Sequence, residues 1–475
     1  MAAQKERIIP KGIVWPFILL TSLFFAWAIP NNLTDTMLAA FKRIMSLSDS
    51  KTAWIQVVCY LFGYGCFAIP GAIFIKKHSY KGGVMLGLSL YAIGTFLFWP
   101  ASRVAVTNNA VGYVLFLGAI LVLFAGLSIL ETSTNSYVCA IGPESTATQR
   151  LNFSQSFNPF GAITGVVISQ IFILSQLNTK TAAERAAMSD TQLAQIQMGE
   201  LSAVTTTYVI LGCVMVALLI AIALTKMPNL KEEGELDFKG STKRLLHNKN
   251  YVWGVIAQFF NIGAQIAVWS YIIRYAMVQL DLQGIIQSLG PDAGSDAVIG
   301  ALRHSEPLAA GFYNFCDAIG LDALLPRTAE QAGATYYIMS LVLFLVMRFV
   351  CTWLMKWFEP RKMVTVIGSM AIVFCLVTVF VQGRIGVYSL MCISGCMSLM
   401  FPTIYGMGIQ GLGEDTKLGG SGMVMAIAGA SVLTQIEGII SDQSGNIAIA
   451  YIVPAIAFAV IVFYSSVIAK KYYKA

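Results

Sequence analysis

The sequence contains very little charge. Only 12% of its 475 residues are Asp, Glu, Lys or Arg, whereas about a quarter of an average soluble domain is charged. Hydrophobic residues make up 57% of the chain, and the mean hydropathy is +0.70. A soluble core does not have this balance over such a length. The composition therefore indicates a polytopic membrane protein embedded in a lipid bilayer.

Motifs for several other functions are also missing. The sequence contains no Walker A loop, no HExxH motif and no nucleic-acid-binding motif. We therefore expect no ATP hydrolysis by this chain, no nucleic-acid partner and no cofactor. The three histidines, His78, His247 and His304, fall outside the apolar segments, which argues against a histidine proton relay in the membrane.

Cysteines do not form a recognisable framework. Eight of the nine lie in or beside apolar segments, and only Cys316 lies in a long polar loop, so a set of disulfides is not expected. Cys392 and Cys396 have helical spacing but no nearby histidine, which favours packing over metal binding. The first apolar segment continues without a small-residue cleavage pattern, so we expect no cleavable signal peptide.

Long apolar runs account for most of the chain. Each is long enough to cross a bilayer as a helix, which predicts an all-α fold with twelve transmembrane spans. The expected spans are 13–41, 52–75, 82–100, 110–139, 152–176, 205–226, 251–277, 335–357, 362–381, 385–410, 420–441 and 447–469.

Basic residues set the expected orientation. With the N-terminus in the cytoplasm, roughly two thirds of the 31 lysines and arginines fall in inner segments, as the positive-inside rule requires. Most of the charged residues in the loop 278–334, which would then lie outside, are acids. We therefore expect both termini to be cytoplasmic, in a bacterial inner membrane.

The sequence also indicates two related halves. A basic hairpin, IKKHSYKGG at 75–83, corresponds in position to MKWFEPRKM at 355–363. Weak internal symmetry of this kind is typical of transporters built from repeats. We expect an N-terminal six-helix half at 1–226, a cytoplasmic linker at 227–250, and a C-terminal six-helix half at 251–475.

Three carboxylates lie at the expected membrane depth, namely Asp35, Glu131 and Glu437. Intramembrane carboxylates are functional candidates because an uncompensated charge is poorly tolerated in hydrocarbon. Glu131 lies well inside its span, whereas Glu437 lies near the outer end of its own, where a position on the rim is equally compatible. Burial favours the protonated form of a carboxyl group. Asp35 and Glu131 are therefore the candidates for proton coupling, with Glu131 as the preferred carrier.

Amides and indoles follow the same spans at helical spacing. Amides pair with hydroxyl groups, and indole rings stack on apolar sugar faces, so this set suits a neutral polyhydroxylated ligand. Fixed cations facing such a ligand are missing, which argues against sugar phosphates and sugar acids. The candidate sugar-binding residues are Trp27, Asn31, Asn32, Asn135, Gln155, Asn158, Gln258, Asn261, Gln265 and Trp269.

Several segments resemble the family of the L-fucose–proton symporters, a branch of the major facilitator superfamily. They are NNLTDT, LETSTNSY, GPES followed by RLNFSQSFNPFGA, AQFFNIGAQIAVWSYIIRYA, GLGEDTKLGGS and SDQSGNI. The resemblance implies the major facilitator fold and alternating access. It also implies that the acids in the first and fourth spans, here Asp35 and Glu131, act in transport.

The resemblance makes proton-coupled import of a neutral monosaccharide the leading function, with L-fucose as the expected substrate and galactose, glucose or another hexose as alternatives. We expect no enzymatic activity and a functional monomer. The chain departs from the family in the length of the loop 278–334 and in Glu437, where a small or apolar residue is expected. Other classes remain as alternatives: an exporter on the same scaffold, a membrane enzyme, and a sugar sensor that does not transport.

Overall fold

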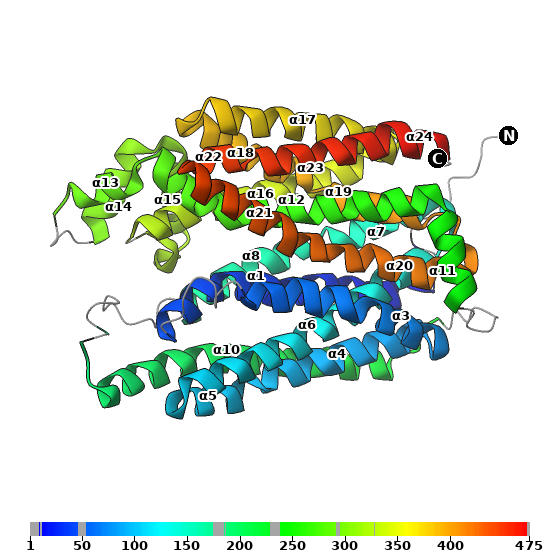
Figure 1. Cartoon of the computed structure of the whole chain (residues 1–475), viewed down its shortest axis with the longest axis horizontal. Helices are drawn as coiled ribbons and strands as arrows, with labels where there is room; N and C mark the ends of the chain where they lie inside the picture. Colours follow the sequence, from blue (N-terminus) through cyan, green and yellow to red (C-terminus); the bar gives the residue numbers. More distant parts are fainter. Residues whose placement is uncertain are drawn as a thin grey trace. The chain divides into compact units, whose positions relative to one another are not determined.

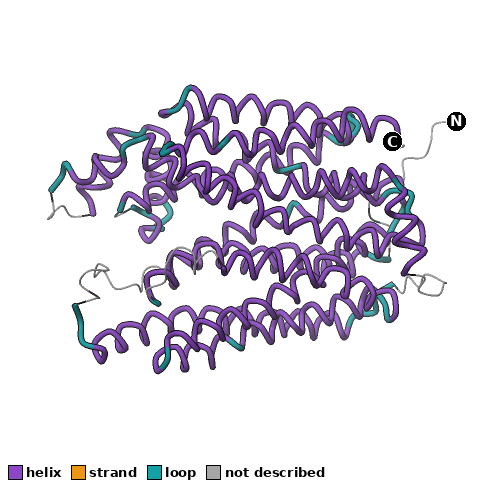
Figure 2. Tube along the Cα trace, viewed as in Figure 1, coloured by secondary structure: helices purple, strands orange, loops and turns teal. Residues whose placement is uncertain are grey.

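The computed structural model describes residues 9, 12–45, 54–173, 185, 187–228, 238–290, 295–326 and 328–472. Within these ranges, the side chains of 34–40, 42, 43, 170, 190, 295, 323, 330 and 417 are not described. All regular structure in the described part of the chain is helical, as Figure 2 shows. The chain groups into two compact units, of which the first contains Met1–Phe259, Pro402–Ser431 and Lys471–Ala475, and the second Phe260–Phe401 and Val432–Lys470.

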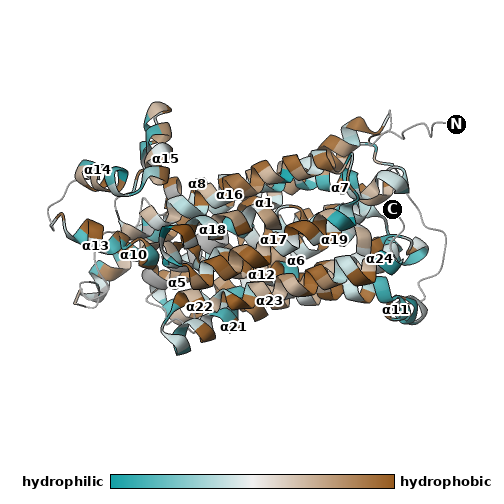
Figure 3. Ribbon diagram, turned by 90° about the horizontal axis from the view of Figure 1, so that it is seen from above, coloured by the Kyte–Doolittle hydropathy of each residue, from teal (hydrophilic) through white to brown (hydrophobic). Residues whose placement is uncertain are grey.

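Twelve helices, some built from two to four consecutive elements, are long and apolar enough to cross a membrane within the described residues. This confirms the predicted number of spans. In Figure 3 long helices such as α12 (Lys249–Gln279) and α23 (Ile452–Phe463) are largely brown, whereas α11 (Phe238–His247) is largely teal. Large apolar side chains also lie exposed on the spans, Leu224 at 82% and Phe380 at 76%. Such exposure fits a surface that faces lipid rather than water.

The first unit contains most of the N-terminal helices (Figure 1). Its elements are α1 (Val14–Ile44), η1 (Val57–Gly65), α3 (Cys66–Lys77), α4 (Tyr80–Phe96), α5 (Phe98–Thr107), α6 (Asn109–Ala140), η2 (Glu144–Thr146), α7 (Ala147–Gln155), α8 (Asn158–Ile168), η3 (Ser169–Ile173), α10 (Asp190–Leu224), α11, the first part of α12, most of α19 (Met400–Ile409), η6 (Gly413–Asp415), α20 (Thr416–Met425) and η7 (Ala426–Ala428).

The second unit contains most of the C-terminal helices. Its elements are the rest of α12, α13 (Leu282–Gln287), α14 (Ser295–Ser305), α15 (Pro307–Ala318), η5 (Asp322–Leu324), α16 (Ala329–Leu354), α17 (Pro360–Phe380), α18 (Gly383–Met397), most of α21 (Gly429–Ser444), α22 (Ile447–Ala450), α23, η8 (Tyr464–Ile468) and the start of α24 (Ala469–Tyr472). The described residues of the long loop predicted at 278–334 thus include three short α-helices, α13, α14 and α15.

Glycines bring α1 and α8 into close contact in the first unit. A Cβ atom at Gly161 would come within 2.0 Å of the carbonyl oxygen of Phe25, and one at Gly165 within 2.5 Å of that of Ile29. The two glycines are four residues apart, the spacing that lets helix backbones approach closely in membranes. This contact fixes the position of α8 against the part of α1 that carries the predicted binding residues.

Two of the differences between the predicted and the observed helix boundaries have a clear local cause. The predicted span 152–176 is broken after Gln155, and α8 starts at Asn158 with Pro159 in its first turn, a position where proline is favoured because no intrahelical N–H is needed there. The span predicted from 205 begins at Asp190 instead, because Ser189 and Gln192 form a capping box. The first turns of this helix are polar, so the search for apolar runs did not include them.

Candidate functional site

Glu131 occupies a buried position on α6. Its exposed fraction is 7%, and its Oε2 atom has no hydrogen-bond partner in the described chain. None of the ion pairs found among the described residues involves it. Burying an ionised carboxylate without a cation partner costs about several kcal/mol of free energy, whereas the neutral acid is tolerated in such surroundings. The geometry therefore suits a carboxyl group that holds a proton.

Tyr64 connects Glu131 to α1. Its hydroxyl accepts a long hydrogen bond of 3.5 Å from Asn31 Nδ2 and also interacts with the Glu131 carboxyl group. The phenol ring is buried and lies in the π-helical element η1, a local geometry often found at functional sites. Three spans thus meet at one hydroxyl group. Sequence reasoning missed Tyr64, although a tyrosine between two glycines in an apolar span is an available signal.

Asn135 and Gln155 form an amide pair one turn beyond Glu131. Gln155 Nε2 donates a hydrogen bond of 3.0 Å to Asn135 Oδ1, and both side chains are buried. Asn135 Nδ2 has no partner among the described residues. An unpaired buried donor costs free energy unless a ligand or water satisfies it. This NH₂ group is therefore available to a ligand hydroxyl.

Trp27 and Asn158 lie around Phe24, where α1 packs on α8. The ring centroids of Phe24 and Trp27 are 4.3 Å apart, and Asn158 Nδ2 donates to the Phe24 carbonyl oxygen at 3.3 Å. The indole ring of Trp27 is fully buried, and its Nε1 atom has no partner in the described part of the molecule. Asn32, in contrast, donates within its own helix, to the Ala28 carbonyl oxygen at 2.9 Å.

Asp35 cannot be placed in this cluster. Its backbone belongs to α1, but its side chain lies outside the described residues. Its predicted role in proton coupling therefore stays a prediction.

The remaining candidates lie on α12, which passes from the first unit to the second after Phe259. Gln258 is buried in the first unit. In the second unit, Asn261 is buried, and both its polar side-chain atoms lack a partner among the described residues. Trp269 Nε1 donates to Ser394 Oγ at 3.1 Å, which fixes the indole ring. Gln265 is half-buried. Each of the two units therefore contains some of the predicted binding residues of α12.

A second set of polar contacts lies around the C-terminal end of α6. Ser136 Oγ lies 3.0 Å from Tyr405 Oη on α19, and Gly411 N donates to Glu144 Oε1 at 3.2 Å. A Cβ atom at Gly420 would lie 2.4 Å from Ser136 Oγ. Helices from the two ends of the sequence therefore pack closely within the first unit. A hydroxyl pair, one hydrogen bond to a carboxylate and a small residue hold this contact together.

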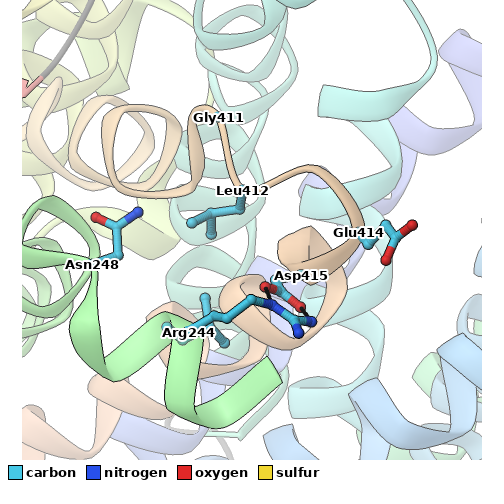
Figure 4. A pocket seen from close by; sticks show the side chains of 7 residues that line it. Arg244, Asn248, Gly411, Leu412, Glu414 and Asp415 are labelled. Atoms are coloured by element: carbon cyan, nitrogen blue, oxygen red, sulfur yellow. Dashed lines mark hydrogen bonds and ion pairs between the residues drawn. The ribbon is translucent and has the colours of Figure 1, made fainter. Parts of the chain in front are cut away.

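An ion pair holds the linker helix α11 to the turn before α20. Arg244 donates two hydrogen bonds to Asp415, from Nε to Oδ2 at 2.8 Å and from Nη2 to Oδ1 at 2.7 Å, as the dashed lines in Figure 4 show. The pair borders a pocket of about 350 Å³ that Leu245, Asn248 and Leu412 also line. The hydrogen bonds from Arg244 hold the pKa of the Asp415 carboxyl group below its ordinary value.

Replacing Arg244 with alanine is expected to lower stability by about 0.5–1 kcal/mol, since the arginine is half exposed and water screens the pair. A carboxyl group whose pKa is depressed on folding stabilises the protein above its unfolded pKa, about 3.9, and this stabilisation is lost as the pH falls through the folded value. The difference in Tm between parent and variant should therefore be constant above about pH 5 and shrink towards pH 3. A difference that persists undiminished at the acid end would show that Arg244 stabilises the protein by other contacts.

Comparisons with known proteins agree with these features. A model of the Major Facilitator Superfamily matches residues 16–433. The L-fucose-proton symporter of Escherichia coli (strain K12) is 36% identical over 465 residues, which cover 97% of this chain and 94% of that protein. A glucose/galactose transporter of Brucella abortus biovar 1 (strain 9-941) is 28% identical over 445 residues, covering 94% and 92%.

A solved structure matches as well. The crystal structure of the E. coli fucose:proton symporter superimposes with a TM-score of 0.77 at 35% identity, covering 96% of this chain and 99% of that one. Together with the twelve long apolar helices among the described residues, these matches make the chain a multi-pass membrane protein. It belongs to the Major Facilitator Superfamily and, within it, to the family that contains the L-fucose–proton symporters.

Proposed function

We propose that this chain imports L-fucose together with protons. The observation that carries the proposal is the buried carboxyl group of Glu131, which has no cation partner and one oxygen without a hydrogen bond among the described residues, beside the amide pair of Asn135 and Gln155. Full-length similarity to L-fucose-proton symporters supports it. The chain's relatives are transporters, which favours transport over enzymatic activity.

Proton binding at Glu131 is coupled to sugar binding by proximity. When the carboxyl group is neutral, the adjacent amide donor and the Tyr64 hydroxyl can bind sugar hydroxyls without an uncompensated charge nearby. When the proton leaves, the carboxylate disfavours the occluded site. Asp35 would complete the pair of acids, as the family resemblance implies. Access from the two sides would alternate by rocking of the two six-helix halves predicted at 1–226 and 251–475, joined by the linker 227–250.

Glucose or galactose is the second candidate substrate, because a glucose/galactose transporter is among the relatives at 28% identity. The greater identity to the L-fucose symporters, 35–36%, favours L-fucose. L-Fucose carries a methyl group at C6 where galactose and glucose carry a hydroxyl, and an apolar pocket rejects an added hydroxyl only moderately. Trp27 or Trp269 would contact this apolar edge.

Uptake into vesicles tests the substrate. Labelled L-fucose should accumulate when an inward proton gradient is imposed, and unlabelled galactose should compete only weakly. Vesicles without the protein supply the background. Proton-driven uptake of glucose that excess L-fucose fails to inhibit would assign the chain to the other substrate.

We also propose that both termini lie in the cytoplasm of a bacterium whose inner membrane holds the protein as a functional monomer. The even number of candidate spans among the described residues supports a common side for both termini, and the distribution of basic residues favours the inside.

Cysteine labelling tests the orientation. In a chain with all nine native cysteines replaced, single cysteines at Lys5 and Lys474 should resist an impermeant thiol reagent in intact cells. A cysteine at Ser305, which ends α14, should react under the same conditions. Permeabilised cells are the control for reactivity. Labelling of position 474 from outside would show that the proposed orientation is wrong.

A further inference from the structure

A stripe of buried polar side chains lies on α21 in the second unit. Thr434, Glu437 and Ser441 are spaced by three and four residues, so they share one helix face. Their exposed fractions are 4%, 0% and 2%. The Thr434 hydroxyl, both Glu437 carboxyl oxygens and the Ser441 hydroxyl have no hydrogen-bond partner within the described ranges. Of the two positions that the sequence left open for Glu437, the one on an exposed rim is therefore excluded, because neighbouring helices cover the side chain completely.

The side chains that face Glu437 do not compensate a charge. It interacts electrostatically with Tyr271 of α12, Cys375 of α17 and Tyr451, which follows α22. The Tyr451 hydroxyl is also buried and has no partner in the part of the chain that the structure describes. Tyrosine and cysteine side chains are neutral at neutral pH. Since no cation pairs with Glu437 among the described residues, the neutral acid is the form that this site accommodates.

A purely structural role would leave a different pattern. Polar residues that hold membrane helices together do so by hydrogen bonds across the interface, and buried polar groups in folded proteins are nearly always paired. Glu437 and the three hydroxyl side chains around it, those of Thr434, Ser441 and Tyr451, make no such bonds among the described residues. Hydroxyl groups can both donate and accept, so this set can solvate the acid in its protonated form and its carboxylate during proton exchange.

Tyr271 links this cluster to exposed charged groups. Its hydroxyl donates a hydrogen bond of 3.4 Å to the carbonyl oxygen of Thr434, and a Cβ atom at Gly438 would lie 2.5 Å from it. The tyrosine therefore lies directly over the turn that carries Glu437. It is half-buried and also interacts electrostatically with the exposed residues Asp442 and Arg274.

We propose that Glu437 is a second proton-binding residue of the transport cycle, surrounded by the hydroxyls of Thr434, Ser441 and Tyr451 and connected to exposed groups through Tyr271. The proposal rests on the proton-coupled transport proposed above. It adds a proton site in the second unit to the site at Glu131 in the first. Two protons would then accompany each sugar, so the sugar gradient at equilibrium would vary with the square of the proton gradient.

Stoichiometry tests this directly. In proteoliposomes, proton influx measured with an internal pH dye and uptake of labelled L-fucose should give two protons per sugar for the parent and one for Glu437→Gln. Glu359→Gln is the matched control, because Glu359 lies at the exposed start of α17 and should leave the ratio at two. A ratio that is the same in Glu437→Gln as in the parent would overturn the proposal. Sugar uptake by the parent without any proton influx would instead refute proton coupling itself.

A second variant covers the case in which Glu437→Gln fails to fold. Tyr271→Phe keeps the ring and removes the hydroxyl group. It is expected to slow proton-driven uptake several-fold while leaving sugar exchange at equal pH on both sides unchanged, because exchange needs no net proton release. If proton-driven uptake by this variant is as fast as in the parent, protons do not reach Glu437 through Tyr271, and the assignment of Glu437 as a proton-binding residue is wrong.

Discussion

Replacing Glu131 with glutamine is expected to abolish accumulation of L-fucose against its gradient. Glutamine mimics the permanently protonated acid, so the sugar site should remain intact. The variant can then still exchange internal for external sugar. It cannot release a proton from this position on the inner side, and in the proposed cycle it is this release that disfavours the occluded site. The physical reason lies in the surroundings of the carboxyl group, which is 7% exposed and has an oxygen without a partner in the described chain. Loss of accumulation should be complete.

The pH dependence gives a second, independent measure of the same effect. If sugar binds to the protonated form, binding by the parent should strengthen as the pH falls, whereas binding by Glu131→Gln should depend less on pH, because only Glu437 would still take up a proton. Glu414→Gln is a suitable control, because Glu414 is exposed and lies outside the spans. Accumulation by Glu131→Gln, or a pH dependence equal to that of the parent, would mean that another group carries the proton.

The spans could be predicted from the sequence because apolar length alone decides which segments cross a bilayer. The twelve predicted spans are confirmed, and so is the family to which the quoted motifs pointed. Boundaries were less predictable. The start of α10 at Asp190 depends on a capping box, and the break between α7 and α8 on one proline. Such local chemistry moves a helix end without changing the hydropathy pattern.

Partners within the site could not be predicted, because they depend on helix rotation. Asn152, Gln155 and Asn158 share a spacing, yet they donate to Thr148, Asn135 and Phe24 respectively. In the sequence Tyr64 looks like an ordinary aromatic residue. In the structure it lies in the π-helical element η1, and its hydroxyl interacts with Asn31 and Glu131. Glu437 was visible as an unusual acid, but its complete burial and its interactions with Tyr271, Cys375 and Tyr451 depend on how the helices pack.

Replacing Asn135 with alanine is expected to weaken L-fucose binding by roughly ten-fold to a hundred-fold, which corresponds to the cost of a buried polar group left unpaired. The substitution removes the free Nδ2 donor and also deprives Gln155 Nε2 of its acceptor at 3.0 Å. Both consequences reduce affinity. The dissociation constant of the purified variant, measured by calorimetry, gives the loss directly.

Asn109→Ala is the matched control for this experiment. Asn109 lies on the same helix, about 39 Å away along its axis at 1.5 Å per residue, and its amide donates to the Met45 carbonyl oxygen at 2.9 Å. Both variants therefore lose a side-chain hydrogen bond of α6, but only one loses it beside Glu131. The double variant Asn135→Ala with Gln155→Ala should bind about as weakly as either single one, because the two amides act as a unit. Equal affinity of parent and Asn135→Ala would show that the amide pair holds α6 to α7 and does not bind the sugar.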